Sequence, residues 1–279
     1  MSVAEGALGK SKLWCVAIIV LVWALGGCNG PKQPLGPAVE LSMPALIARI
    51  NGNNKLIRNL WSRLDIKVES PDEKHSVGGH LILRKEYGQP PRDLLLRGRD
   101  SLGQAEFQLG SNDQRYWYML RAPRTDDVYH FAAYDSPDAP VGQAAQVLDL
   151  LSVLGVYELP DEPDQPPWPV CRGYDEPARY VISYVERTAE GSLRARKDVS
   201  WNRRSQQVDL IELFDERGQR YLAAELGDYK KVKGAELATQ IQISWFEEKL
   251  TLRLKLKDVQ INNPHKVTDK SFRTPDWAQ

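Results

Sequence analysis

The sequence predicts a mainly β protein: an open, strongly curled antiparallel β-barrel of about eleven strands, with two helices that form a lid or a plug. Short runs in which apolar and polar residues alternate recur along most of the chain, with turn-forming residues between them. Two other segments carry apolar residues at helical spacing. A flat sheet does not bury so many apolar faces, so we expect the sheet to curl around the helices. A β-sandwich is the alternative.

The chain begins with a segment typical of a secretory signal peptide. Two lysines precede an apolar run from Leu13 to Gly27, which is 15 residues long, against the roughly 20 residues that cross a bilayer. The run ends in Leu25-Gly26-Gly27-Cys28, which resembles the lipobox of bacterial lipoproteins. We therefore expect residues 1–27 to be removed and Cys28 to carry covalent lipid. A transmembrane anchor is the alternative.

The lipid on Cys28 implies a membrane as a partner. Several acyl chains on one residue would make the attachment effectively permanent, whereas a single chain binds only marginally. Asn29 follows the cysteine; in the enterobacterial lipoproteins that this region resembles, Asp at this place retains the protein in the inner membrane, so Asn29 favours the outer membrane, periplasmic face. Residues 28–41 are rich in Pro and Gly and are expected to be a flexible tether, followed by a single domain over residues 42–279.

The first expected element of the domain is an amphipathic helix. Apolar residues from Met43 to Leu64 recur at spacings of three, four and seven, and Ser42 can cap the helix. Gly52-Asn53-Asn54 weakens its middle, so we expect a bend or an interruption there. A helix that covers one face of a core is the leading interpretation, and a partner-binding helix is the alternative.

An antiparallel meander is predicted next, because the apolar period changes to two and the connections are too short for crossover helices. Its runs span residues 64–69, 79–85, 92–97, 104–109 and 114–120.

A second helix is predicted over residues 141–156, which carry an apolar stripe that includes Leu151 and Leu154. A proline-rich loop over residues 160–177 follows and is unsuited to the centre of a sheet. The alternation then resumes, most clearly in the last run, where leucines alternate with Thr, Arg and Lys. The runs of this second half span residues 179–186, 196–201, 207–213, 220–226, 237–245 and 249–257.

Composition excludes several classes of protein. The chain has 37 basic and 37 acidic residues, so it has no electrostatic footprint for nucleic acid. Cys15 leaves with the signal peptide and Cys28 is acylated, so Cys171 alone remains and no intrachain disulfide is expected. Apart from Arg172, Cys171 has no basic or His neighbour in sequence, and we interpret it as an ordinary thiol.

The sequence does not predict an enzyme. It contains no nucleophile elbow, phosphate-binding loop, dinucleotide fingerprint or Cys-x-x-Cys pair. None of its four histidines has a second ligand at metal-binding spacing on a helix, so we expect no metal and no cofactor other than the covalent lipid on Cys28. An active site assembled from distant residues is the alternative. The four histidines are His75, His80, His130 and His265.

The stretch from Arg92 to Leu109 resembles the same region of the LolA and LolB family of lipoprotein-localisation factors, and is most LolB-like around Leu102. In that family an apolar strand leads through a turn with Pro-Leu-Gly into an alternating strand, and here Ser101-Leu102-Gly103 occupies the turn. The helix before the first strand and the late Leu-rich strand are also similar, over most of residues 41–264. The resemblance implies an open β-barrel with helices as a lid over a hydrophobic cavity that takes up lipoprotein acyl chains.

The resemblance also assigns a role to Leu102, that of an exposed apolar residue on a protruding loop that helps to deliver cargo into the membrane. A turn residue folded onto the core is the alternative. Apart from the resemblance, a barrel lined by large apolar groups suits an apolar guest, because each methylene removed from water contributes about 0.8 kcal/mol. We expect five residues to face inward as candidate cavity residues, with simple core packing as the alternative: Trp117, Trp201, Trp245, Leu252 and Leu254.

These observations predict an outer-membrane-anchored periplasmic lipoprotein that binds acyl chains such as palmitate, or lipidated cargo, in lipoprotein or lipid handling. Candidate partners are lipoproteins, acyl lipids and a periplasmic carrier protein. The alternative is a structural or envelope-stress signalling lipoprotein with a closed barrel and no transported ligand. A dry interior on the order of several hundred cubic ångströms would favour the first function, and an interior filled by side chains the second.

Overall fold

The computed structural model describes residues 36–85, 93–121, 127–134, 149–162 and 164–278. Residues 37–279 form one unit, which contains every strand. The predicted signal peptide, Cys28 and most of the predicted tether lie outside the described residues. Within the described ranges, no helix combines the length and the apolar character needed to cross a membrane.

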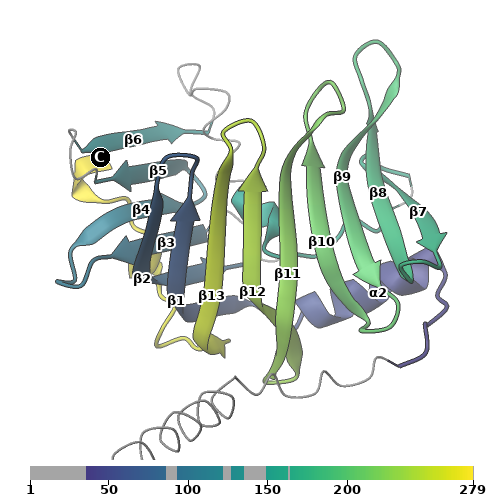
Figure 1. The fold of residues 1–279 in the computed structure, drawn as a ribbon, viewed down its shortest axis with the longest axis horizontal. Helices are drawn as coiled ribbons and strands as arrows, with labels where there is room; N and C mark the ends of the chain where they lie inside the picture. The colour runs from purple at the N-terminus through teal and green to yellow at the C-terminus, as the bar shows by residue number, and fades with distance from the viewer. Residues whose placement is uncertain (1–35, 86–92, 122–126, 135–148, 163, 279) are drawn as a thin grey trace, which may run out of the picture. The chain divides into compact units, whose positions relative to one another are not determined.

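Thirteen antiparallel strands form one curled sheet in the order β6-β5-β4-β3-β2-β1-β13-β12-β11-β10-β9-β8-β7 (Figure 1). The chain moves outward from the centre through the first six strands, restarts at the opposite edge with β7 and returns to the centre, where β13 pairs with β1. The first six strands are β1 (Asn59–Glu69), β2 (Lys74–Arg84), β3 (Asp93–Arg99), β4 (Ala105–Ser111), β5 (Arg115–Leu120) and β6 (Val128–Ala133). The others are β7 (Trp168–Tyr174), β8 (Arg179–Arg187), β9 (Leu193–Asn202), β10 (Gln207–Phe214), β11 (Arg220–Val232), β12 (Ala235–Trp245) and β13 (Leu250–Ile261).

The mainly β, open and curled architecture is as predicted, but the strand count is thirteen rather than eleven. The two missed strands, β6 and β7, are the two edges of the sheet. In β6 the exposed and half-buried residues do not alternate regularly. The alternation that identifies a strand in the sequence is therefore weak there. In β7, Pro169 lies inside the stretch predicted to be a proline-rich loop; an edge strand tolerates Pro because its missing N–H can face away from the ladder.

Helix α2 (Met43–Asn54) ends earlier than the apolar pattern extends. The prediction of helical spacing up to Leu64 is wrong beyond Asn54, because Leu60 and Leu64 belong to β1 and are buried there with Ser62 and Ile66. Leu60 and Leu64 are four residues apart, and this spacing puts two residues on one face in a helix and in a strand alike. The apolar pattern therefore does not distinguish a helix from a strand at these positions. The predicted interruption at Gly52-Asn53-Asn54 marks the true end of the helix.

The second helix is present at residues 149–153, and the earlier part of its predicted range, residues 141–148, lies outside the described residues. Two short 3-10 helices, η1 (Asp269–Phe272) and η2 (Asp276–Ala278), follow β13. The Asn112 side chain donates to the carbonyl of Phe272 at 3.1 Å, and the Trp277 and Tyr129 rings lie 5.2 Å apart. The C-terminal segment therefore lies against the β3 to β6 half of the sheet.

The sheet has an inner face, which carries the main core, and an opposite outer face. In β13, Leu252, Leu254 and Leu256 are buried in the core, whereas Arg253 and Lys255 point away, as the alternation predicts. Side chains of α2 and of residues 150–159 complete this core. We call α2 together with residues 149–160 the cover, because both segments pack on the inner face.

Candidate functional site

The two parts of the cover are joined to one another by asparagine side chains. Asn51 Nδ2 donates to the carbonyl of Leu159 at 2.9 Å, and the Leu159 N–H donates to Asn51 Oδ1 at 2.7 Å. Asn54 Nδ2 donates to the carbonyl of Tyr157 at 2.6 Å. Asn51 and Asn54 are both buried, so these amides satisfy backbone groups that would otherwise be buried without a partner.

Lys85, just after β2, fastens the cover to the sheet. Its Nζ donates to the carbonyls of Asn54 at 2.6 Å and Val156 at 2.9 Å, and to Glu158 at 3.0 Å. Burial lowers the pKa of Lys85, and Glu158 opposes that shift. One ammonium group thus holds the C-terminal end of α2 and the second part of the cover at the same point, an arrangement in which all three of its protons are used.

Two further buried charges lie where residues 149–153 meet the sheet. Lys197 Nζ donates to the carbonyl of Ser152 at 2.8 Å, and burial lowers the pKa of Lys197 to about 8. The Tyr221 hydroxyl donates to Asp149 Oδ2 at 2.8 Å, and burial raises the pKa of Asp149 to about 6 against the effect of that bond. Both charges would regain water if this part of the cover moved away from the sheet.

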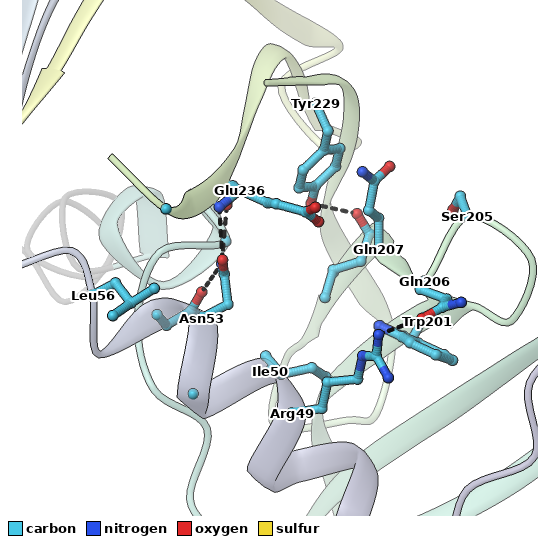
Figure 2. Close-up of a pocket in the computed structure, with 15 residues that line it drawn as sticks. Arg49, Ile50, Asn53, Leu56, Trp201, Ser205, Gln206, Gln207, Tyr229 and Glu236 are labelled. Atoms are coloured by element: carbon cyan, nitrogen blue, oxygen red, sulfur yellow. Dashed lines mark hydrogen bonds between the residues drawn. The ribbon is translucent and has the colours of Figure 1, made fainter. Parts of the chain in front are cut away.

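A cleft of about 530 Å³ opens at one end of the cover, between α2 and two turns of the sheet (Figure 2). Arg49 and Asn53 reach it from α2, Gln206 from the β9–β10 turn, and Glu236 from the start of β12. Asn53 exchanges hydrogen bonds of 2.9 Å and 2.7 Å with the backbone of Glu236. Arg49 donates to Gln206, so α2 is tied to both turns.

The cleft combines an apolar floor with a polar mouth. Trp201, Val208 and Ile50 are buried residues of its lining. Of the described lining residues, Arg49 and Glu236 are the charged ones. Such a lining suits an amphiphilic guest, with an apolar part on the floor and a polar part at the mouth.

Four of the five predicted inward residues lie on the inner face. Trp201 is buried in the core, stacks on Tyr180 with ring centroids 6.2 Å apart, and lines the cleft. Trp245, Leu252 and Leu254 are also part of the buried core. Their orientation is the predicted one, and their role in binding stays a prediction.

Trp117 lies on the outer face, contrary to the predicted orientation. Tyr116 belongs to the inner core, and successive residues of a strand point to opposite faces. Trp117 is nonetheless fully buried. Gly110 lies directly opposite it on β4, and a Cβ at Gly110 would be 2.4 Å from the indole. The error arose because Tyr116 and Trp117 are both buried, so the sequence does not reveal which one faces the core.

Leu102 is 83% exposed, at the tip of the turn between β3 and β4. Asp100 Oδ1 accepts hydrogen bonds from the N–H groups of Leu102 at 2.9 Å and Gln104 at 2.8 Å. Gly103 has φ of +83°, a conformation that favours glycine. The turn therefore holds Leu102 out into solvent, and the alternative in which it folds onto the core is wrong.

Two cysteines and the metal-ligating residue types complete the list of predicted or candidate residues. Cys28 lies outside the described residues, and its lipidation stays a prediction. Cys171 is a free thiol in β7, and burial raises its pKa, which disfavours a thiolate. Over the described ranges, His, Cys, Asp and Glu do not gather in a group able to hold a metal ion.

Sequence reasoning missed the residues that fasten the cover. Asn51, Asn54 and Lys85 do not form a local motif, because Leu159, Tyr157 and Val156 are distant in sequence. One signal was present: Asn54 follows Ile47 and Ile50 at spacings of seven and four, so an amide occupies the apolar stripe of α2. A polar residue in that stripe needs a buried partner.

Comparisons with known proteins identify the fold. No family model and no curated protein matches the sequence. The structure is similar to that of a DUF1329 family protein from Desulfovibrio piger, with a TM-score of 0.53 and 11% identity over 85% of this chain and 97% of that chain. It is also similar to a LolA superfamily protein from Nitrosomonas europaea, with a TM-score of 0.50 and 10% identity over 85% of this chain and 100% of that chain. The predicted LolA/LolB-like fold is confirmed.

Proposed function

We propose, from the LolA/LolB-like fold and its apolar inner face, that this protein binds the acyl chains of lipids or lipidated proteins reversibly and without covalent chemistry. The observation that carries the proposal is the construction of the core. A curled, open sheet presents a continuous apolar inner face, and a separate cover packs on it through a small number of side-chain hydrogen bonds. An acyl chain can take the place of part of that cover.

The energetics favour an apolar guest. A chain of roughly 16 carbons gains on the order of 10 kcal/mol when it leaves water, before ordering costs. Binding also requires cover side chains to leave the inner face, which offsets part of this gain. The cleft beside Trp201 is a suitable entrance, because it already separates α2 from the β9–β10 turn.

We further propose that the chain acts in lipoprotein or lipid handling from a membrane anchor at Cys28, on the periplasmic face of the outer membrane. Exposure of Leu102 on a hydrogen-bonded turn supports this placement, because an apolar tip of this kind can enter the surface of a bilayer or contact a partner. Lipoproteins, acyl lipids and a periplasmic carrier protein are the candidate partners.

A second function, a structural or signalling module, is favoured by one observation. In the part of the chain that the structure describes, side chains of the cover fill the inner face, including Leu46, Ile47 and Leu154. A protein that never released its cover would present only its outer surface to a partner.

Brominated fatty acid distinguishes these functions. We would titrate the chain from residue 28 onward, with Cys28→Ala, with dibrominated stearic acid and record tryptophan fluorescence, with native mass spectrometry for stoichiometry. Bromine quenches only nearby indoles, so the inner-face residues Trp201 and Trp245 should be quenched. Trp201→Phe and Trp245→Phe should each remove part of the quenching, whereas the matched outer-face control Trp117→Phe should leave it in place.

A stoichiometric complex with this pattern of quenching would support the carrier function. An empty protein in the mass spectrum, with no quenching at saturating fatty acid, would refute it and leave the structural module. Quenching that disappears only with Trp117→Phe would place the guest on the outer face and would also contradict the proposal.

A further inference from the structure

A second hollow lies on the outer face of the sheet, beside the turn that carries Leu102. It has a volume of about 660 Å³ and is lined by residues of β2, the end of β3, the β3–β4 turn and Glu106 of β4. Gly78 is one of the lining residues, and a Cβ there would have no atom within 4 Å. Arg99 is the direct partner of Gly78 across the β2–β3 ladder, so an arginine borders a space that no side chain fills.

Cationic residues form a row across three neighbouring strands at this hollow. Arg63 of β1 pairs directly with His80 of β2, and His80 pairs directly with Arg97 of β3. Arg99, two residues beyond Arg97, points to the same face. Arg63 and Arg97 therefore lie on either side of His80, and Arg97 and Arg99 place two guanidinium groups beside the hollow.

The C-terminal segment adds a further cation to this row. Lys266 Nζ lies 4.7 Å from the centroid of the Trp61 ring, and Trp61 and His80 rings are 5.5 Å apart. Burial, and then the charges of Arg99, Arg63, Arg97 and Lys266, lower the pKa of His80. Burial and the charge of Arg99 also lower the pKa of Arg97. The cations are therefore close enough to affect one another.

Two acidic residues, Asp100 and Glu106, line the hollow, and each is engaged in another interaction. Glu106 pairs with His75, and Asp65 pairs with Lys257 at 2.6 Å. Asp100 Oδ1 accepts the two backbone hydrogen bonds that shape the Leu102 turn. Among the described residues Arg63 has a carboxylate partner, Asp258.

Arg97 and Arg99 differ from that pattern. The guanidinium of Arg97 donates to the neutral amide of Gln108. Within the described ranges, neither Arg97 nor Arg99 has a carboxylate within ion-pair distance. Elsewhere on the same face two cationic residues of β13 do pair, Arg253 with Glu69 at 2.5 Å and Lys257 with Asp65.

We infer that the hollow at Gly78, lined by His80 and Arg99 and flanked by Arg97, the direct partner of His80, is a binding site for a phosphate group, and that the neighbouring Leu102 brings this site to the phosphate headgroups of an anionic membrane. Guanidinium groups bind phosphate through paired hydrogen bonds, and Gly78 leaves room for the tetrahedral anion. Leu102 is only three residues from Arg99, so its entry into the apolar layer places Arg99 at headgroup depth. The site is on the face opposite to the acyl-binding one and does not depend on it.

Nuclear magnetic resonance of the histidines tests the site directly. The protein is the chain from residue 28 onward with Cys28→Ala, which retains the whole sheet and core. Its histidine resonances are titrated with pH alone, with inorganic phosphate, and with dihexanoyl phosphatidylglycerol, and His80→Gln assigns the His80 signal. A bound anion should raise the pKa of His80 by about one unit or more. His130, at the β6 edge, is the internal control and should not shift.

Vesicle binding tests the source of the phosphate. Arg97→Gln and Arg99→Gln should each weaken binding to vesicles that contain phosphatidylglycerol by about fivefold, and should weaken binding to vesicles of phosphatidylcholine alone less, because choline balances the charge of that phosphate. Lys231→Gln is the matched control, because it removes one exposed charge at the far end of β11. Leu102→Ala should weaken binding to both kinds of vesicle.

A His80 pKa that neither probe raises would overturn the phosphate site. Equal losses of vesicle binding in Arg99→Gln and Lys231→Gln would also overturn it, because they would indicate a general effect of net charge. A response to inorganic phosphate without any response to vesicles would support the anion site and refute the membrane as its source. Neither result bears on quenching by brominated fatty acid, so this site and the proposed function can fail separately.

Discussion

Replacement of Asn51 by alanine tests whether the two parts of the cover are joined as the structure indicates. Asn51→Ala removes two hydrogen bonds, of 2.9 Å and 2.7 Å, and leaves the N–H and carbonyl of Leu159 without partners in a buried setting. Each unsatisfied buried group costs about 1 to 3 kcal/mol, and alanine returns about 0.5 kcal/mol of helix propensity. The free energy of unfolding should therefore fall by about 1.5 to 5.5 kcal/mol.

Asn53→Ala is the matched control, because it also removes two side-chain hydrogen bonds to backbone from the same helix. Those bonds, to Glu236, are exposed, so water replaces them. The variant also removes a bond of 3.1 Å from Asn53 to Asn54 Oδ1 but leaves the bond from Asn54 to Tyr157 in place, so the loss should stay at about 1 kcal/mol. Urea denaturation gives both values. Hydrogen exchange by mass spectrometry should show faster exchange over residues 156–160 in Asn51→Ala alone.

The same variant carries information on function. If acyl chains bind only after the cover moves, then a loosened cover increases the fraction of binding-competent protein and raises the apparent affinity. Asn51→Ala should therefore bind brominated fatty acid more tightly than Asn53→Ala does. Equal destabilisation by the two variants, or unchanged exchange over residues 156–160, would refute the assigned role of Asn51.

Three further predictions follow from buried charges, close packing and exposure. Asp149 has a folded pKa of about 6 against 3.8, so the folded state binds more protons and the free energy of unfolding should fall as the pH rises between these values. For Lys197 the pKa drops from 10.5 to about 8, so stability should rise with pH over that interval. Denaturation series on Asp149→Asn and Lys197→Met should lose the lower and the upper slope respectively, and persistence of either slope would contradict its assignment. Gly110→Ala should destabilise by about 1 to 3 kcal/mol, because its Cβ would lie 2.4 Å from Trp117; Gly227→Ala, with open space at the corresponding position, should be close to neutral, and equal melting temperatures for the two would argue against the tight fit. Leu102→Glu should leave the free energy of unfolding within about 0.5 kcal/mol while reducing partition into vesicles, and a marked loss of stability would show that Leu102 packs on the fold.

The cover illustrates why the site was only partly predictable. Apolar spacing located α2 and indicated that it packs on a core, because that signal is local. Pairing of Asn51 with Leu159 and of Lys85 with Val156 depends on contacts between segments far apart in the chain. Polar residues that make such contacts do not recur at a regular spacing in the sequence, so no periodic pattern reveals them.

The outer-face cations show the same limit. Arg63, His80 and Arg97 belong to three different strands, and each strand taken alone reads as an ordinary solvated face. They are close because of the register between the strands. The lengths of the turns and the burial of one apolar face together determine that register. A local sequence motif therefore does not predict this row of residues.

By itself, the sequence determined the fold class and the alternation of faces within strands such as β13. These properties depend on residues within one element, where a period of two is physically sufficient. The tertiary structure decided the pairing of β1 with β13, the two edge strands, the exposure of Leu102 and the face on which Trp117 lies. Alternation shows that neighbouring residues point in opposite directions, but only packing against the cover or the C-terminal segment decides which of those directions is the inner one.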